Sequence, residues 1–315
     1  MRVTSAVKAR LATVALLLLA LWPAATPASP VSRADASAPA VAVAQATVPV
    51  LMYHYVRVDT MPGDSAGFAL SVTPQDFAAQ MALLRAEGFH TVSLADVRRA
   101  WDGAPLPPRA VVLSFDDGDA DFATAALPVL LRNGFTATAF VISDNVGRAG
   151  YMSAQQLAQV VAAGITVGSH TVDHPDLTTL PTSAVWWELR TARSDLQELT
   201  GQSVDDLAYP YGTWNAGVAE QAAQAGYADA VTVAPGAVLQ SAQRYALPRV
   251  RVSGGESLAA FGQSVGVELA ATAAPAPCGT WAVAADGGLV AAGGADGGVL
   301  TFGDARFAGA PLQPL

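Results

Sequence analysis

The chain has 315 residues, of which 52% are hydrophobic and 14% are charged, and its formal net charge is −9. This length and composition predict one large globular domain with room for a small appendage. Nucleic-acid binding is disfavoured in so acidic a chain, because that affinity comes largely from basic side chains on phosphates. With a single cysteine, Cys278, the chain can form no intrachain disulfide, so its fold must rest on its core.

Residues 1–28 have the pattern of a secretory signal peptide. Arg2, Lys8 and Arg10 form a basic start, and an apolar run at 11–22 is followed by small residues suited to cleavage. The run is shorter than the roughly 20 residues of a membrane-spanning helix. We therefore expect cleavage, no remaining transmembrane segment, and a secreted or envelope-associated protein; a retained anchor is the alternative. Of the 17 basic residues, 14 would remain against 26 acidic ones, a net charge of −12.

Strand-like and helix-like patterns alternate from residue 47 to residue 268, after an Ala/Pro/Ser-rich linker predicted at 29–46. In chain order, strands are predicted at 48–56, 90–94, 110–115, 136–143, 165–169, 206–210, 228–233 and 246–252. Helices are predicted between them at 73–89, 95–103, 121–135, 153–164, 183–201 and 215–227, and after the last strand at 257–266. Ser153 and Gln156 have the spacing of a capping box at the start of one helix.

Alternating strands and helices predict parallel β/α units, whose strands are apolar throughout because both faces are covered. Seven or so repeats favour a barrel or a distorted barrel. In such folds the chemistry gathers at the carboxyl ends of the strands.

The last part of the chain has a different composition. Residues 269–277 predict a second linker, and residues 278–315 are rich in glycine. Within them "AADGGLV" is soon followed by the similar "GADGGVL", which predicts short hairpin strands joined by Asp-Gly turns. One such unit is too small to bury its own core, so it docks on the main domain or is a remnant of a longer array.

Five polar side chains lie at or just beyond predicted strand ends. Asp116 and Asp117 follow the strand 110–115, and His54 lies within the motif "VLMYHYV". His170 and His174 have a spacing that places both rings on one face of a helical turn. If the strands are parallel in one barrel, all five groups converge on one rim.

Two imidazoles and a carboxylate are suited to a catalytic zinc ion that keeps one position open for water. Asp117 could then bind the metal, and Asp116 could accept a proton from its water. Cobalt and nickel accept the same ligands. Each motif alone is also compatible with a turn or a solvated helix face, and only their joint occurrence predicts a metal site. His90, which opens a strand, is interpreted as an exposed histidine without a role.

Three motifs together resemble those of the NodB-type polysaccharide deacetylases, carbohydrate esterase family four. They are "SFDDG" (114–118), "SHTVDH" (169–174) and "AYPYG" (208–212), and the resemblance spans roughly residues 48–267. The opening "VPVLMYHYV" looks like the branch that contains poly-N-acetylglucosamine deacetylases of biofilm matrices. The resemblance implies a distorted (β/α)7 barrel that removes N-acetyl groups from an N-acetylglucosamine polysaccharide and releases acetate.

The resemblance also implies a role for each matching residue. Asp116 would be the general base, and Asp117, His170 and His174 would hold a divalent metal, zinc before cobalt or nickel. His54 would be the general acid that protonates the departing amine.

Two further positions follow from the same resemblance. Tyr211 would offer its backbone N–H to the oxyanion of the tetrahedral intermediate. Many family members carry an arginine where this chain has Ala208, and that arginine orients the catalytic aspartate. Arg249 could supply a substitute charge near the same rim, or it could be a surface ion-pair partner.

Aromatic residues near the motifs suit a sugar site. Tyr53, Tyr209, Tyr211 and Trp214 could stack on pyranose faces, or they could pack in the core or at the rim.

Two alternatives stay open. The first is a non-catalytic protein that binds cell-wall or matrix glycans, because the tail resembles "W-x-V-x-x-D-G-G…F-G-D-A-x-F-x-G" repeats of secreted actinobacterial proteins. The intact aspartates and histidines argue against it, although the tail could still associate with a cell wall. The second is a peptidoglycan deacetylase or an O-acetyl esterase, because the reacting centre would be the same.

Overall fold

The computed structural model describes residues 45–269, together with the segments 281–283, 289–292 and 299–302. The predicted signal peptide at 1–28 lies outside the described residues, as do most of both predicted linkers and Cys278. These assignments therefore stay predictions. Among the described helices, none is long and apolar enough to cross a membrane.

Seven parallel strands close into a barrel. They are β2 (Val50–Tyr53), β6 (Ala110–Phe115), β7 (Thr138–Val141), β8 (Thr166–Ser169), β9 (Asp206–Ala208), β10 (Asp229–Pro235) and β12 (Leu247–Arg251). Their order is β2-β12-β10-β9-β8-β7-β6, and the pairing of β2 with β6 closes the ring. Every one of these neighbouring pairs is parallel. The predicted (β/α)7 barrel is confirmed.

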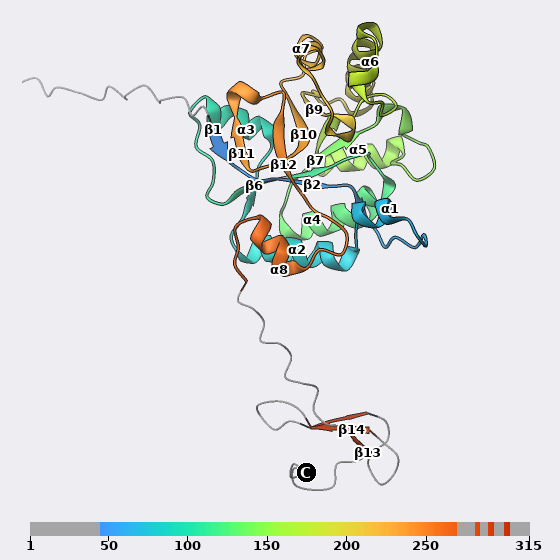
Figure 1. Ribbon diagram of the computed structural model, residues 1–315, viewed down its shortest axis with the longest axis vertical. Helices are drawn as coiled ribbons and strands as arrows, with labels where there is room; N and C mark the ends of the chain where they lie inside the picture. The colour runs from blue at the N-terminus through green and yellow to red at the C-terminus, as the bar shows by residue number, and fades with distance from the viewer. Residues whose placement is uncertain (1–44, 270–280, 284–288, 293–298, 303–315) are drawn as a thin grey trace, which may run out of the picture. The chain divides into compact units, whose positions relative to one another are not determined.

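Helices cover the outside of the barrel, with α2, α4 and α8 on one side and α6 and α7 on the other (Figure 1). The helices are α1 (Ser65–Leu70), α2 (Pro74–Ala86), α3 (Leu94–Trp101), α4 (Leu127–Asn133), α5 (Ala154–Ala162), α6 (Thr182–Thr200), α7 (Ala216–Gln224) and α8 (Leu258–Ser264). The predicted capping box at the start of α5 is present, because Ser153 and Gln156 satisfy each other's backbone N–H groups.

Three predicted elements differ from the structure. The strand predicted at 48–56 is split at His54 into β2 and β3 (Tyr55–Val56). The strand predicted at 90–94 is reduced to β5 (His90–Thr91), because Ser93 caps α3. The helix predicted at 121–135 starts as a π-turn at Phe122–Ala126 and becomes α4 only at Leu127.

Short elements complete the domain. β1 (Gln45–Thr47) pairs antiparallel with β11 (Val238–Gln240), so pairing begins two residues inside the predicted first linker. β3 pairs with β4 (Ser71–Val72), and β5 lies beside the start of β6. Four 3₁₀ turns lie at Ser143–Asn145, Leu177–Thr179, Pro210–Gly212 and Ser241–Gln243.

The strands contribute to two cores because their side chains alternate between the two faces. One set fills the barrel: Val50, Val112, Phe140, Ala208, Val231 and Leu247. The other set packs under the helices: Leu51, Leu113, Ala139, Val167, Leu207 and Ala230. This alternation decides which residues at the strand ends can reach the barrel mouth.

The amino ends of two barrel strands are tied together by a buried charge cluster. Arg98 of α3 donates to Asp206 of β9 at 2.6 Å and also to Asp229 of β10. Asp206 is 2% exposed and Asp229 is fully buried, so each carboxylate depends on this arginine for its charge partner.

The described part of the tail is a three-stranded antiparallel sheet. It consists of β13 (Trp281–Val283), β14 (Leu289–Ala292) and β15 (Val299–Phe302), in the order β13-β14-β15. The predicted hairpin strands are therefore present, whereas the predicted Asp-Gly turns lie outside the described residues.

Candidate active site

The candidate site lies at the carboxyl ends of the barrel strands, where the alternation of side chains brings three groups inward. His54 comes two residues after Met52 of β2, Asp116 two after Ser114 of β6, and His170 follows β8 directly. All three line one recess of about 260 Å³. Side chains that point into the barrel at the carboxyl ends of parallel strands lie close together at one opening of the barrel.

Asp117 reaches the same recess through a left-handed turn. Simple alternation would point it away from Asp116, but its φ of 73° and the φ of 80° at Gly118 reverse the chain. A Cβ at Gly118 would lie 3.1 Å from Val141 Cγ1, so glycine suits this position on both counts. The turn explains how two adjacent carboxylates both face the mouth.

The two histidines also come together, although not on a helical turn as the spacing suggested. The segment after β8 is an irregular loop in which Thr171 and His174 have φ values of 67° and 65°. The His174 N–H donates to Thr171 Oγ1 at 3.1 Å, which stabilises this conformation. Local side-chain bonding at two left-handed residues therefore replaces the expected helical geometry.

The donor atoms of Asp117, His170 and His174 fit a metal ion. The two Nε2 atoms are 3.1 Å apart, and they lie 3.6 and 3.9 Å from Asp117 Oδ1. Nitrogen and oxygen ligands at about 2.0–2.1 Å from a tetrahedral zinc ion would be about 3.3 Å apart. The three groups are therefore spaced as ligands around a shared cation.

Ala208 fixes the tautomer of His170. The carbonyl oxygen of Ala208 can only accept a hydrogen bond, so His170 Nδ1, 2.8 Å away, must carry the proton. This leaves the lone pair on Nε2 directed at Asp117 and His174, as metal ligation requires.

Asp116 is paired with a buried arginine. Arg249 Nη1 and Nη2 donate to the two carboxylate oxygens at 2.7 Å each, and Nη1 also lies 3.3 Å from Ser114 Oγ. Burial alone would raise the pKa of Asp116, but the Arg249 guanidinium outweighs burial and holds that pKa well below its usual range. The charge beside Asp116 thus comes from β12, and Arg249 is no surface ion-pair partner, being 1% exposed.

His54 is a second neighbour of Asp116, with its Nε2 3.9 Å from Oδ2, the oxygen that also accepts from Arg249 Nη2. Burial lowers the pKa of His54, while Asp116 and Asp117 act in the opposite direction without cancelling that effect. The imidazole is therefore mainly neutral at pH 7.

The four predicted sugar-stacking aromatics occupy different places. Tyr211 is 63% exposed at the recess, with its ring centroid 4.7 Å from that of His174. Tyr53 is fully buried between Phe77 and Phe115, because it alternates with His54 and faces the helices. A stacking role does not fit Tyr53.

The remaining two aromatics also offer no ring face to this recess. Tyr209 borders it but is fully buried, and its hydroxyl donates to the carbonyl of Tyr245 at 3.1 Å. Trp214 is 43% exposed and lines a separate cavity together with Thr232 and Tyr245. Of the predicted four, Tyr211 alone presents an exposed ring at the recess.

Sequence reasoning missed two residues that support the site. The Tyr55 hydroxyl donates to Asp117 Oδ2 at 3.1 Å, and Glu188 of α6 accepts the N–H of Val172 at 2.8 Å, inside the histidine loop. Burial raises the pKa of Glu188 to about 7. The position of Tyr55, next to His54, was a usable signal, whereas nothing local to α6 marks Glu188.

Comparisons with known proteins agree with this geometry. A family model described as polysaccharide deacetylase matches residues 103–230. YxkH of Bacillus subtilis, named as a predicted polysaccharide deacetylase, is 33% identical over 219 residues, which cover 69% of this chain and 75% of YxkH. The poly-β-1,6-N-acetyl-D-glucosamine N-deacetylase of Staphylococcus epidermidis is 26% identical over 225 residues, covering 64% and 78%.

Solved structures show the same fold. The deacetylase PplD of Streptococcus pyogenes, in complex with acetate, matches with a TM-score of 0.65 at 30% identity, covering 69% of this chain and 97% of PplD. The polysaccharide deacetylase BC0361 of Bacillus cereus matches with a TM-score of 0.63 at 27% identity, covering 70% and 69%. The chain belongs to the polysaccharide deacetylase family, whose members are hydrolases that act on N-acetyl amide bonds.

Proposed function

We propose that this chain is a secreted, metal-dependent N-deacetylase that removes acetyl groups from an N-acetylglucosamine-containing polysaccharide and releases acetate. The observation that carries the proposal is the convergence of two aspartates and three histidines in one recess, with Asp116 paired to Arg249. The similarity to a poly-N-acetylglucosamine deacetylase supports this substrate class. An intact set of reactive groups in a family of hydrolases disfavours the non-catalytic alternative.

A divalent ion held by Asp117, His170 and His174 would polarise the acetamido carbonyl and lower the pKa of a water molecule. Zinc suits this ligand set, and cobalt and nickel accept the same donors. Tyr55 keeps the Asp117 carboxylate oriented through its hydrogen bond to Oδ2.

Asp116 acts as the base in this proposal. Its carboxylate stays ionised because Arg249 stabilises the charge, and each oxygen keeps a second lone pair beyond the one that Arg249 occupies. It accepts the proton of the attacking water, whose oxygen then bonds to the carbonyl carbon. The backbone N–H of Tyr211 stabilises the resulting oxyanion, and one such donor contributes about 3 kcal/mol in comparable sites.

His54 delivers a proton to the nitrogen that leaves. The imidazole is neutral before reaction, and it lies 3.9 Å from the carboxylate that has just taken up a proton. The proton passes from Asp116 to His54 and then to the amine, and the C–N bond breaks to give acetate and a free amino sugar. This sequence restores both side chains to their starting states.

Export and envelope association belong to the same proposal. The signal-like residues 1–28 support secretion, and the glycine-rich tail supports cell-wall association. N-terminal sequencing of protein recovered from the medium, compared with cell-bound protein, tests both expectations.

The proposal is tested by Asp116→Asn in the full chain. We expect acetate release from N-acetylglucosamine hexamers to fall by about 100- to 10,000-fold, the range typical of a lost general base. Bound metal, measured by mass spectrometry, should stay unchanged because the three ligands remain. The exposed Asp102→Asn serves as the matched control and should retain full activity.

Full activity in Asp116→Asn would show that another group is the base. The glycan is identified by comparing β-1,4 and β-1,6 N-acetylglucosamine hexamers, peptidoglycan fragments and an O-acetylated sugar in the same acetate assay. Acetate from the O-acetylated sugar alone would replace the deacetylase proposal with an esterase.

A further inference from the structure

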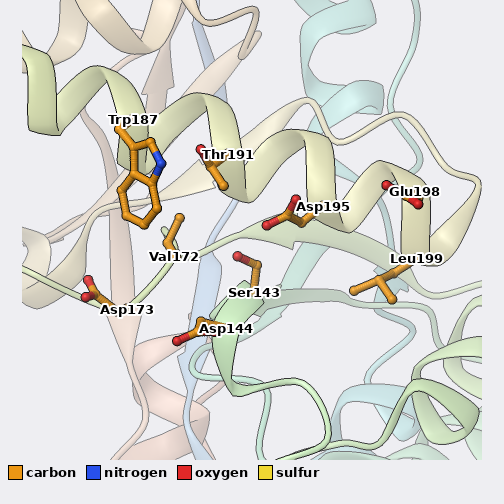
Figure 2. A pocket seen from close by; sticks show the side chains of 9 residues that line it. All are labelled: Ser143, Asp144, Val172, Asp173, Trp187, Thr191, Asp195, Glu198 and Leu199. Atoms are coloured by element: carbon orange, nitrogen blue, oxygen red, sulfur yellow. The ribbon is translucent and has the colours of Figure 1, made fainter.

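A second recess lies beside the candidate active site, between α6 and the loops that follow β7 and β8. It has a volume of about 470 Å³, and Figure 2 shows the side chains that line it. The lining includes Ser143, Asp144, Asp173, Trp187, Asp195 and Glu198. The two recesses share one loop: His170 and His174 face the active site, whereas Val172 and Asp173 border this second groove.

The groove contains a buried hydroxyl that has no partner. Ser143 is 7% exposed, and its Oγ makes no hydrogen bond within the described residues. The backbone of this loop is satisfied, because Ser143 and Asp144 donate their N–H groups to the carbonyls of Thr171 and Val172. In Figure 2 the Ser143 side chain points from its loop toward the α6 side of the groove. A buried hydroxyl left unpaired is unfavourable, so this group suits a polar ligand.

An indole side chain forms one wall. Trp187 is 52% exposed, whereas its neighbour Trp186 packs against the core. Two adjacent residues of a helix point in different directions, so only one of them could be buried. The free indole offers an apolar face of the kind on which a pyranose ring stacks.

The other walls are acidic. Asp144 is paired with Arg148 four residues along the chain. In the domain that the structure describes, no arginine forms an ion pair with Asp173, Asp195 or Glu198. Exposed carboxylates gathered beside an aromatic face favour a cationic ligand with an apolar ring face.

We propose that this groove is a second glycan subsite that binds an already deacetylated, amine-bearing glucosamine unit of the polymer. The inference rests on the proposed function, because hydrolysis of the acetamide turns a neutral sugar into one that carries an ammonium group. The pyranose face packs on Trp187, the ammonium lies among the carboxylates, and a sugar hydroxyl or the ammonium donates to Ser143 Oγ. Because the two recesses share a loop, a polymer can occupy both at once.

The binding test uses the full chain carrying Asp116→Asn, which holds acetylated ligands without turnover. Calorimetry compares a glucosamine hexamer with a fully N-acetylated hexamer at low and high salt. We expect the glucosamine hexamer to lose at least tenfold in affinity on Trp187→Ala or Asp195→Asn, and to weaken with salt. Both side chains are exposed, so these changes leave the fold intact. Trp214→Ala, an exposed tryptophan outside both recesses, should bind as before.

The activity test uses the chain without Asp116→Asn. Trp187→Ala should lower kcat/KM at least fivefold on partly deacetylated polymer and leave it unchanged on a single acetylated disaccharide, which cannot reach both recesses. Unchanged binding of the glucosamine hexamer in both groove variants would overturn the subsite. So would equal, salt-independent binding of the two hexamers, or a groove that binds calcium but no sugar.

Failure of the subsite and failure of the proposed function have different signatures. If the protein releases acetate and the groove variants still bind the glucosamine hexamer normally, the subsite is refuted and the proposed function stands. If no N-acetylated glycan yields acetate but the glucosamine hexamer binds in a way that depends on Trp187, the proposed function is refuted and the subsite stands.

Discussion

At the scale of single residues, the pairing of Asp116 with Arg249 decides how the candidate base behaves. Both side chains are almost fully buried, and each is the other's main charge partner. Pairs of this kind add little net stability, but removing one partner leaves an uncompensated buried charge. Arg249 is therefore a positioning residue whose loss should be visible in both folding and acid–base behaviour.

Replacing Arg249 with methionine should move the acid limb of the kcat/KM profile to higher pH. Burial raises the pKa of Asp116 once the guanidinium is gone, so the carboxylate protonates at a higher pH and the base is lost there. The free energy of unfolding should also fall by about 3–5 kcal/mol. Acetate release between pH 4 and 9 measures the first effect, and urea denaturation measures the second.

Arg249→Lys should restore part of the profile because it keeps the charge while losing the two-pronged contact. The control is Arg109→Met, which removes an exposed pair with Glu87 and should change neither quantity appreciably. An unshifted acid limb in Arg249→Met would contradict the role assigned to this arginine.

Individual site residues were predictable from sequence where the motif and the strand register agree. Three of them continue the line of side chains that face the barrel interior, and all three border the recess: Asp116, His54 and His170. Tyr53 was misassigned because the neighbour of an inward residue in a strand faces the other way. Tyr55 and Glu188 were missed because their roles depend on contacts across the fold, which one sequence does not display.

At the scale of elements, the barrel strands position the site through the sizes of their inward side chains. Gly168 of β8 is an example. A Cβ there would lie 2.5 Å from Phe140 Cδ1 and 3.1 Å from the carbonyl oxygen of Asp206. The glycine therefore makes room for the Phe140 ring inside the barrel, two residues before His170.

We predict that Gly168→Ala destabilises the domain by about 1–3 kcal/mol, because a packed interior has no space for the added methyl group. Urea denaturation followed by circular dichroism measures this change. Gly217→Ala, at an open position near the start of α7, should be neutral or slightly stabilising, because alanine favours helix. Equal changes in the free energy of unfolding for the two substitutions would show that the barrel interior can accommodate the added methyl group at β8.

Element boundaries were predicted best where a cap marks them. Ser153 caps the start of α5, as its capping-box spacing indicated. The histidine loop was predicted as a helical turn because spacing carries no information about left-handed backbone at Thr171 and His174. The β1–β11 pair was missed because its first strand lies in a stretch with linker-like composition.

At the scale of the whole molecule, the alternation of strands and helices favoured a parallel barrel, and the family resemblance implied its seven-stranded form. Closure is a global property, but it follows from local patterns because each β/α unit repeats the same packing. The pH dependence of stability is also a global property, and a carboxyl group on α6 is one contributor to it.

Glu188 should make the protein less stable as pH rises from 5 to 8. Its pKa is about 7 in the folded state, above the ordinary value of 4.5, so the unfolded chain ionises first and is favoured. Glu188→Gln removes this loss, so the variant should gain about 1–3 kcal/mol relative to the unmodified chain over that range. Denaturation at several pH values tests this, and a pH-independent difference would refute it. Glu220→Gln, on the exposed face of α7, is the control.

The position of Arg249 in the chain has a consequence for how activity is acquired. Asp116, Asp117, His170 and His174 all precede β9, whereas Arg249 lies on β12, which enters between β10 and β2 to complete the ring. A chain still lacking β12 carries the proposed metal ligands and the candidate base but not the guanidinium that pairs with that base in the folded barrel. In the proposed mechanism the candidate base therefore gains its charge partner only when β12, the final strand of the barrel, closes the ring.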